Sequence, residues 1–185
     1  MKNNLIKNKS QIFKELSIKT NIHYGNRLRQ LRNLLVLKPE DLSVVLTIST
    51  NTIKKAEEGG NVGIEIIGEL ALFYGFTLEQ FYNIEILPSW EELTKQIITF
   101  NKKHKSIAYE ILLDRPNLQD LIEFRILATD LFKEWINESQ VIEYCKKEYN
   151  YNYSSATNTL NNCVNKGWLI SDENSKPKRY RLKIK

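Results

Sequence analysis

The segment from Tyr24 to Tyr82 is divided into short apolar stretches by residues that begin or end helices. Pro39 favours the first turn of a helix, because the donor that proline lacks would have no partner there. Ser49 is a typical N-cap, and Gly59 readily adopts the backbone angles at which helices end. These signals predict a series of short helices, over about residues 24–36, 39–46, 50–58, 64–74 and 77–83.

Apolar residues recur along this segment at the spacing of helix faces. The residues are Leu28, Leu31, Leu35, Leu42, Leu46, Ile48, Ile53, Leu70 and Phe73. Only a compact bundle would bury all of these faces together. The sequence therefore predicts a five-helix domain over residues 23–85, preceded over residues 1–22 by a basic arm or a short helix.

The boundary residues and the apolar residues combine into one longer pattern. It consists of Gly25, Arg27, Leu28, Leu31, Arg32, Leu37, Pro39, Glu40, Asp41, Leu42, Ile48, Ser49, Thr52, Ile53, Glu57, Gly59, Leu70, Ala71, Gly75, Thr77, Leu78 and Phe81. The pattern covers about a third of the chain and resembles the phage-repressor family of helix-turn-helix proteins, also called the Cro or XRE type. The resemblance implies a domain that binds double-stranded DNA.

In that family the helix over residues 50–58 would be the recognition helix, with its first residues against base edges in the major groove. Ser49 and Thr52 would lie near phosphates or cap the helix, and Lys38 would supply a phosphate contact. An asparagine such as Asn51 can pair bidentately with adenine, and lysine reaches guanine acceptors. The groove-facing positions implied by the resemblance are Thr50, Asn51, Lys54 and Lys55.

The pattern also departs from the family at specific positions. Glutamine is usual where Pro39 stands, alanine where Ser43 stands, and glycine where Thr47 stands. The glutamine normally contacts DNA, so its absence moves the expected base contacts onto the recognition helix. Arg32 and Glu57 match family positions that form a structural salt bridge.

The second half of the chain begins with an interruption before Pro88, where we expect the domain boundary, and Ser89 then caps a new helix. Further helices are expected near residues 105–113 and over a longer stretch, 118–136. Helices at about 139–149 and 154–166 then precede two short strands, residues 167–170 and 180–184. Residues 86–185 are thus expected to be a helical and winged-helix-like domain with a terminal β-hairpin.

The passage from Leu160 to Ile170 resembles the step from recognition helix to wing in winged-helix proteins. Contacts that specify sequence would then come from Ser154, Ser155, Asn158 and Asn162. Lys178 and Arg179 of the wing would neutralise phosphates. Winged helices also serve as protein-interaction modules, so a protein partner for this domain is the alternative.

Charge and residue types favour binding over catalysis. The formal net charge of +5 suits a polyanionic partner. His23 and His104 lie far apart, Cys145 and Cys163 are not spaced as metal ligands, and no glycine-rich phosphate loop is present. The sequence therefore predicts no enzyme activity, no metal, no cofactor and no membrane partner, in a cytoplasmic protein.

The overall expectation is a mainly α, sequence-specific DNA-binding transcriptional regulator of the repressor-like type. It could bind as a homodimer on paired half-sites or as a monomer that uses both domains. An antitoxin or mobile-element accessory protein, which holds a protein partner through its carboxy-terminal domain, is the main alternative. A replication or recombination accessory protein is another.

Overall fold

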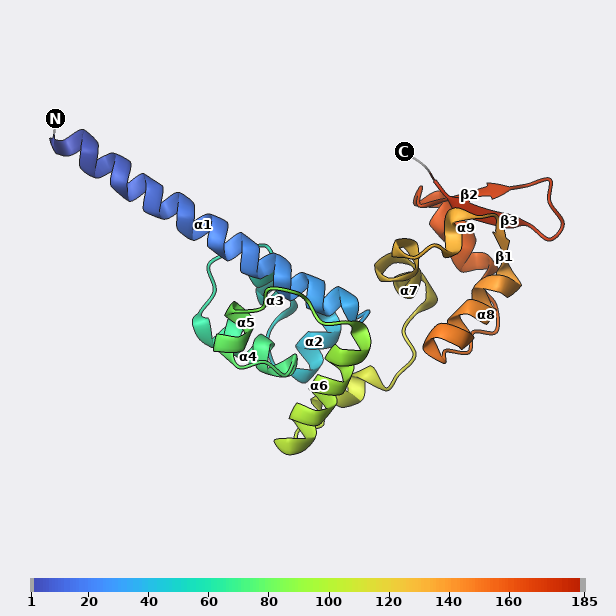
Figure 1. Ribbon diagram of the computed structural model, residues 1–185, viewed down its shortest axis with the longest axis horizontal. Coiled ribbons are helices and arrows are strands. Elements are labelled where there is room, and N and C mark those ends of the chain that lie inside the picture. The colour runs from blue at the N-terminus through green and yellow to red at the C-terminus, as the bar shows by residue number, and fades with distance from the viewer. Residues whose placement is uncertain (1, 184–185) are drawn as a thin grey trace. The chain divides into compact units, whose positions relative to one another are not determined.

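The computed structural model describes the backbone of residues 2–183 and the side chains of residues 11–183. The chain is mainly helical, with a small three-stranded antiparallel sheet, which confirms the coarse prediction. It divides into two compact units, unit 1 (Met1–Asp114) and unit 2 (Arg115–Lys185), seen in Figure 1. Within the described residues, no helix combines the length and apolar character that are needed to cross a membrane.

Unit 1 begins with one long helix, α1, which runs from Lys2 to Leu34. The expected arm and the expected helix over 24–36 are therefore parts of a single helix. The expected α-helix over 105–113 is wrong, because only residues 108–112 are helical there and they form a 3₁₀ helix. The other elements are α2 (Pro39–Val45), α3 (Thr50–Glu57), α4 (Ile64–Phe73), α5 (Leu78–Tyr82), α6 (Trp90–Lys103) and η1 (Ala108–Leu112).

The apolar faces predicted from the sequence form the core of unit 1. The buried residues include Leu28, Leu31, Leu35, Leu42, Leu46, Ile48, Ile53, Leu70 and Phe73. Leu93 and Ile97 of α6 are buried in the same core. Because α6 packs there, unit 1 extends to Asp114, whereas the sequence predicts a boundary near Pro88.

Two glycines allow α1 and the carboxyl end of α3 to approach closely. A Cβ on Gly25 would lie 2.6 Å from both the carbonyl oxygen of Ala56 and the amide nitrogen of Gly59. Gly59 has a φ of 74°, which favours glycine, and its own Cβ would lie 2.6 Å from the backbone of Ile22. The crossing of α1 over α3 therefore depends on glycine at both positions.

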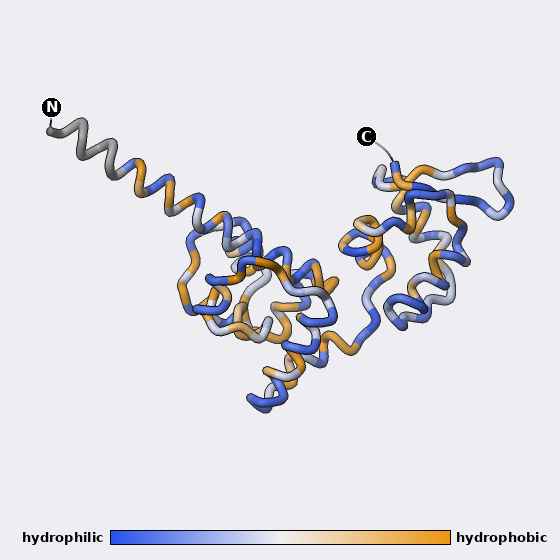
Figure 2. Tube along the Cα trace, viewed as in Figure 1, coloured by the Kyte–Doolittle hydropathy of each residue, from blue (hydrophilic) through white to orange (hydrophobic). Residues whose placement is uncertain are grey.

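The part of α1 between Gln11 and His23 is exposed to solvent along its whole length. Figure 2 shows apolar positions alternating with hydrophilic ones along it. A helix turns about 100° per residue, so these apolar residues lie on more than one side. They are Ile12, Phe13, Leu16, Ile18 and Ile22.

Unit 2 does not contain the long helix that the sequence predicts over 118–136. The helix α7 ends at Phe124, and Arg125 leaves the helical region with φ −133° and ψ −55°. The Thr129 hydroxyl then donates to the carbonyl of Ile126 and accepts from the amide of Leu131, which replaces helical hydrogen bonds. The helices of unit 2 are α7 (Leu118–Phe124), η2 (Ile126–Ala128), η3 (Leu131–Lys133), α8 (Glu138–Tyr149) and α9 (Thr157–Asn165).

The sheet of unit 2 consists of the expected terminal hairpin and one strand that the sequence did not predict. The hairpin strands are β2 (Leu169–Asp172) and β3 (Arg179–Leu182), and the added strand is β1 (Ile136–Asn137). The order is β1-β3-β2, with both pairings antiparallel and Ile136 opposite Tyr180. The added strand β1 therefore covers one edge of β3 and leads directly into α8 (Figure 1).

Candidate nucleic-acid interface

In unit 1, α2 and α3 follow one another across a short turn that includes a residue in the left-handed region. Thr47 has a φ of 51° and is exposed, whereas its neighbours Leu46 and Ile48 are buried. Buried residues on both sides fix the turn against the core. The left-handed angle explains why a glycine suits this position better than the β-branched threonine found here.

The amino end of α3 is capped by its own flanking residue. The Ser49 hydroxyl accepts from the Thr52 amide at 3.1 Å, and the two hydroxyls of Ser49 and Thr52 lie 2.8 Å apart. Thr50 is half-buried, and its hydroxyl donates to Ser43 at 3.2 Å. Of the predicted site residues, Ser49, Thr50 and Thr52 therefore take part in local hydrogen bonds.

The two faces of α3 differ sharply. Ile53, Ala56 and Glu57 are buried against the bundle. Asn51, Lys54 and Lys55 are exposed on the outside, as the sequence predicts, and Lys38 is exposed at the start of α2. The backbone amide of Lys38 donates to Asp41 at 2.6 Å, which caps α2.

A buried ion pair holds the inner face of α3 against α1. The guanidinium of Arg32 donates to both carboxylate oxygens of Glu57, at 2.6 Å and 2.7 Å, and to the carbonyl of Leu37 at 2.7 Å. Both side chains are almost fully buried, while Arg29 reaches the same carboxylate from the surface at 3.6 Å. This confirms the structural salt bridge that the family resemblance implies.

A second ion pair joins the outer face of α3 to α2. Lys54 Nζ lies 2.9 Å from Glu40 Oε1, and the two side chains are 50% and 56% exposed. The hydrogen bond from Lys54 lowers the pKa of Glu40 below its usual range. Sequence reasoning missed this partner, because the two residues are 14 positions apart and only the packing of α2 on α3 brings them together.

In unit 2 a carboxylate occupies the amino end of α9. Glu138, the first residue of α8, accepts from the amides of Ala156 and Thr157 at 2.6 Å and 3.0 Å. It also accepts from the hydroxyls of Thr157 and Ser155 at 2.6 Å and 2.8 Å. These bonds, that from the Thr157 hydroxyl foremost, lower the pKa of Glu138 to about 2. The hydroxyl of Ser155 is therefore engaged by Glu138.

The other predicted residues of unit 2 lie on two surfaces. Ser154, Asn158 and Asn162 are exposed just before α9 or along it. On the hairpin, Arg179 is exposed, whereas Lys178 is half-buried and its Nζ lies 2.7 Å from Glu173 Oε1. The carboxylate of Glu173 partly neutralises the charge of Lys178, which was expected to contact phosphate.

His23 contacts a neighbouring side chain, and the two cysteines are buried. His23 Nε2 lies 3.0 Å from the guanidinium of Arg27. Cys145 and Cys163 are fully buried, and burial raises the pKa of each thiol to about 11. Across the described part of the chain, no three His, Cys, Asp or Glu side chains come together as a metal site would require.

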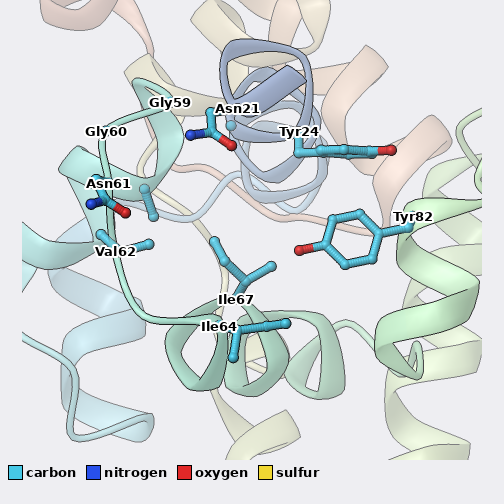
Figure 3. A pocket seen from close by; sticks show the side chains of 11 residues that line it. Asn21, Tyr24, Gly59, Gly60, Asn61, Val62, Ile64, Ile67 and Tyr82 are labelled. Atoms are coloured by element: carbon cyan, nitrogen blue, oxygen red, sulfur yellow. The ribbon is translucent and has the colours of Figure 1, made fainter. Parts of the chain in front are cut away.

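A small open pocket lies beside the crossing of α1 and α3. Figure 3 shows it between α1, the loop after α3, and the helices α4 and α5. Its volume is about 150 Å³, and its lining includes Asn21, Tyr24, Ile64, Ile67 and Tyr82. The lining mixes polar and apolar groups and carries no charged side chain.

Comparison with known proteins gave no match, whether to protein-family models, to curated proteins or to solved structures.

Proposed function

We propose that this protein is a sequence-specific double-stranded DNA-binding regulator, in which α2, the turn at Thr47 and α3 form a helix-turn-helix. In this proposal α3 is the recognition helix and lies in the major groove. The order and lengths of the two helices support it, as does the buried Arg32–Glu57 pair, which matches the repressor-like pattern.

The main support for the proposal is that one face of α3 is buried against the bundle while the opposite face is exposed to solvent. Ile53 and Glu57 fix the helix to the bundle, so its outer side chains have a defined orientation. Asn51 can pair with adenine, and Lys54 and Lys55 can donate to guanine or to phosphate. A rigid element that presents these groups is what direct reading of base edges requires.

Contacts to the DNA backbone would come from the margins of this surface. Ser49 and Thr52 lie at the amino end of α3, where helix amides and the helix dipole favour anions. Lys38 is exposed at the amino end of α2. Each lysine that neutralises a phosphate makes the affinity more dependent on salt.

For unit 2 we propose a winged helix, in which α9 follows α8 as the second helix and the β2–β3 hairpin is the wing. The antiparallel hairpin directly after α9 supports this proposal. Asn158 and Asn162 on α9, with Arg179 on the hairpin, would be its contacts to DNA. Unit 2 would thus add affinity to the contacts of unit 1.

One observation favours a second candidate function for unit 2. The Glu138 carboxylate places a negative charge at the amino end of α9, where a phosphate would otherwise approach. This suits a unit that binds a protein partner, as in an antitoxin or mobile-element accessory protein. In that case only unit 1 would contact DNA.

The test is selection from a random duplex pool by the full-length protein at low salt. We expect an enriched motif, bound with an affinity that falls as salt rises. Arg179→Ala should weaken binding to all sequences alike if unit 2 contacts phosphate, and should have no effect if unit 2 holds a protein partner. Absence of duplex binding by the full-length protein at low salt would overturn the proposed function.

A further inference from the structure

The Glu40–Lys54 pair lies on the outer side of α2 and α3, next to the proposed base reader Asn51. Asn51 and Lys54 are three residues apart on α3 and therefore share a face of the helix. Lys54 Nζ and Glu40 Oε1 are 2.9 Å apart, and both side chains remain about half exposed. The surface thus presents a cationic donor and an anionic acceptor side by side.

This pair has little to contribute to stability. Exposed ion pairs contribute little, because water and salt screen their attraction and ordering the two long side chains costs entropy. The core of unit 1 and the buried Arg32–Glu57 pair already hold α2 and α3 in place. Both charged groups of the pair remain accessible to a ligand.

The major-groove edge of a base pair carries the complementary arrangement. In a G·C pair the guanine O6 accepts and the cytosine N4 donates, and in a T·A pair the thymine O4 accepts and the adenine N6 donates. These two atoms are hydrogen-bonded to each other across the base pair, at about 2.9 Å. Their spacing equals that of Lys54 Nζ and Glu40 Oε1.

We propose that Glu40 and Lys54 act together as a specificity-determining pair, which reads the orientation of one base pair in the DNA site. Lys54 donates to the keto oxygen of guanine or thymine, and Glu40 accepts from the amino group of the paired cytosine or adenine. Guanine is favoured because its N7 gives Lys54 a second acceptor. This inference rests on the proposed function of unit 1.

The same arrangement opposes binding to phosphate. Glu40 repels phosphate oxygens, and Lys54 must leave its carboxylate partner to neutralise one. A base pair in the reversed orientation sets Lys54 against an amino group and Glu40 against a keto oxygen. One mismatch sets two donors against each other and the other sets two acceptors against each other, so the base amino and keto groups lose their hydrogen bonds to water without replacement, which is costly at an interface.

The experiment is selection from a random duplex pool by the full-length protein, its Glu40→Ala variant and a Glu91→Ala control. Glu91 holds in α6 the position that Glu40 holds in α2, the second residue of the helix, and it is equally an exposed acid. The wild type should select one position as G·C over C·G by at least about fivefold. Glu40→Ala should lose that preference and gain a salt slope steeper by about one phosphate contact, while the control keeps both wild-type properties.

A charge exchange, E40K/K54E, makes the test sharper. It should reverse the preferred orientation at that one position and leave the rest of the motif unchanged. An unchanged motif in Glu40→Ala and in the exchange variant would overturn the inference while leaving the proposed function intact. Absence of duplex binding by the wild type would overturn both.

Discussion

The helices α3 and α9 each follow a neighbouring helix across a short connection, but their amino ends are closed in different ways. At α3 a neutral hydroxyl, that of Ser49, accepts the Thr52 amide. At α9 the carboxylate of Glu138 accepts two amides and two hydroxyls. The amino end of α3 therefore keeps the partial positive charge of a helix amino end. At α9 the carboxylate of Glu138 neutralises that charge.

The difference means that the amino ends of α3 and α9 offer an anion different surroundings. A phosphate or base near the start of α3 meets helix amides and the exposed Asn51. Near the start of α9 it meets a carboxylate whose pKa is lowered to about 2, so it is charged at all physiological pH values. We therefore propose that α3 reads the DNA sequence and that unit 2 has a supporting part.

The largest expected effect concerns the buried pair that locks α3. Arg32→Met leaves the Glu57 carboxylate buried without its main partner, and loss of one member of a buried pair costs about 3–5 kcal/mol. Hydrogen exchange resolved by peptide should show unit 1 unfolding while unit 2 stays protected. The matched control is Arg29→Met, because Arg29 reaches the same carboxylate from the surface. Equal losses in the two variants would contradict the assigned role of Arg32.

The close crossing of α1 and α3 is the next target. Gly25→Ala sets a methyl group against the backbone of Ala56 and Gly59, and overpacking of this kind costs about 1–3 kcal/mol. Gly68→Ala on α4 meets no atom within 4 Å and should instead stabilise by about 0.5–1 kcal/mol. Urea unfolding of unit 1 measures both. A neutral Gly25→Ala would show that the helices can separate without cost.

The cap on α9 gives a pH-dependent prediction for unit 2. The folded-state pKa of Glu138 is lowered to about 2, so its stabilising effect is complete above about pH 4.5 and is lost as the pH falls toward 2. Glu138→Gln should cost about 1 kcal/mol at neutral pH, as loss of a helix cap does. It should also flatten the acid dependence of unfolding in this range. An acid profile identical to that of the wild type would refute the role of the carboxylate.

The smallest effect concerns the turn before α3. Thr47 holds a left-handed angle that costs a β-branched residue about 1–2 kcal/mol, part of which glycine recovers. Thr47→Gly should raise the stability of unit 1 by about 0.5–1 kcal/mol after the entropy cost of glycine. Thr47→Ala keeps the left-handed strain and should give no comparable gain. Equal thermal midpoints for the three proteins would show that the turn is not strained.

Local signals predicted much of unit 1, because Pro39, Ser49 and Gly59 act on the helix ends next to them. The Arg32–Glu57 pair followed from the family resemblance. The length of α1 did not follow, since its exposed apolar residues lie on several sides and give no clear periodic face. The helix nevertheless continues, because no proline interrupts it.

The features that the sequence did not predict depend on tertiary placement. The strand β1 is two residues long and exists through its pairing with β3, more than 40 positions later. Glu138 reaches the start of α9, and Glu40 reaches Lys54, only after the helices have packed. The expected helix over 118–136 ends at Phe124, where Arg125 leaves the helical region, and beyond it the Thr129 hydroxyl offers the backbone a competing turn. The helical spacing of apolar residues alone does not predict such a turn.

The central claim is that α3 reads bases and that the start of α9 does not. The direct measurement is the affinity of the full-length protein for its selected site and for single-base variants of that site, in wild type, Asn51→Ala and Asn158→Ala. We expect Asn51→Ala to lose about 1–3 kcal/mol of discrimination at one base pair, whereas Asn158→Ala should keep the wild-type discrimination everywhere. Loss of discrimination in Asn158→Ala with none in Asn51→Ala would contradict the account.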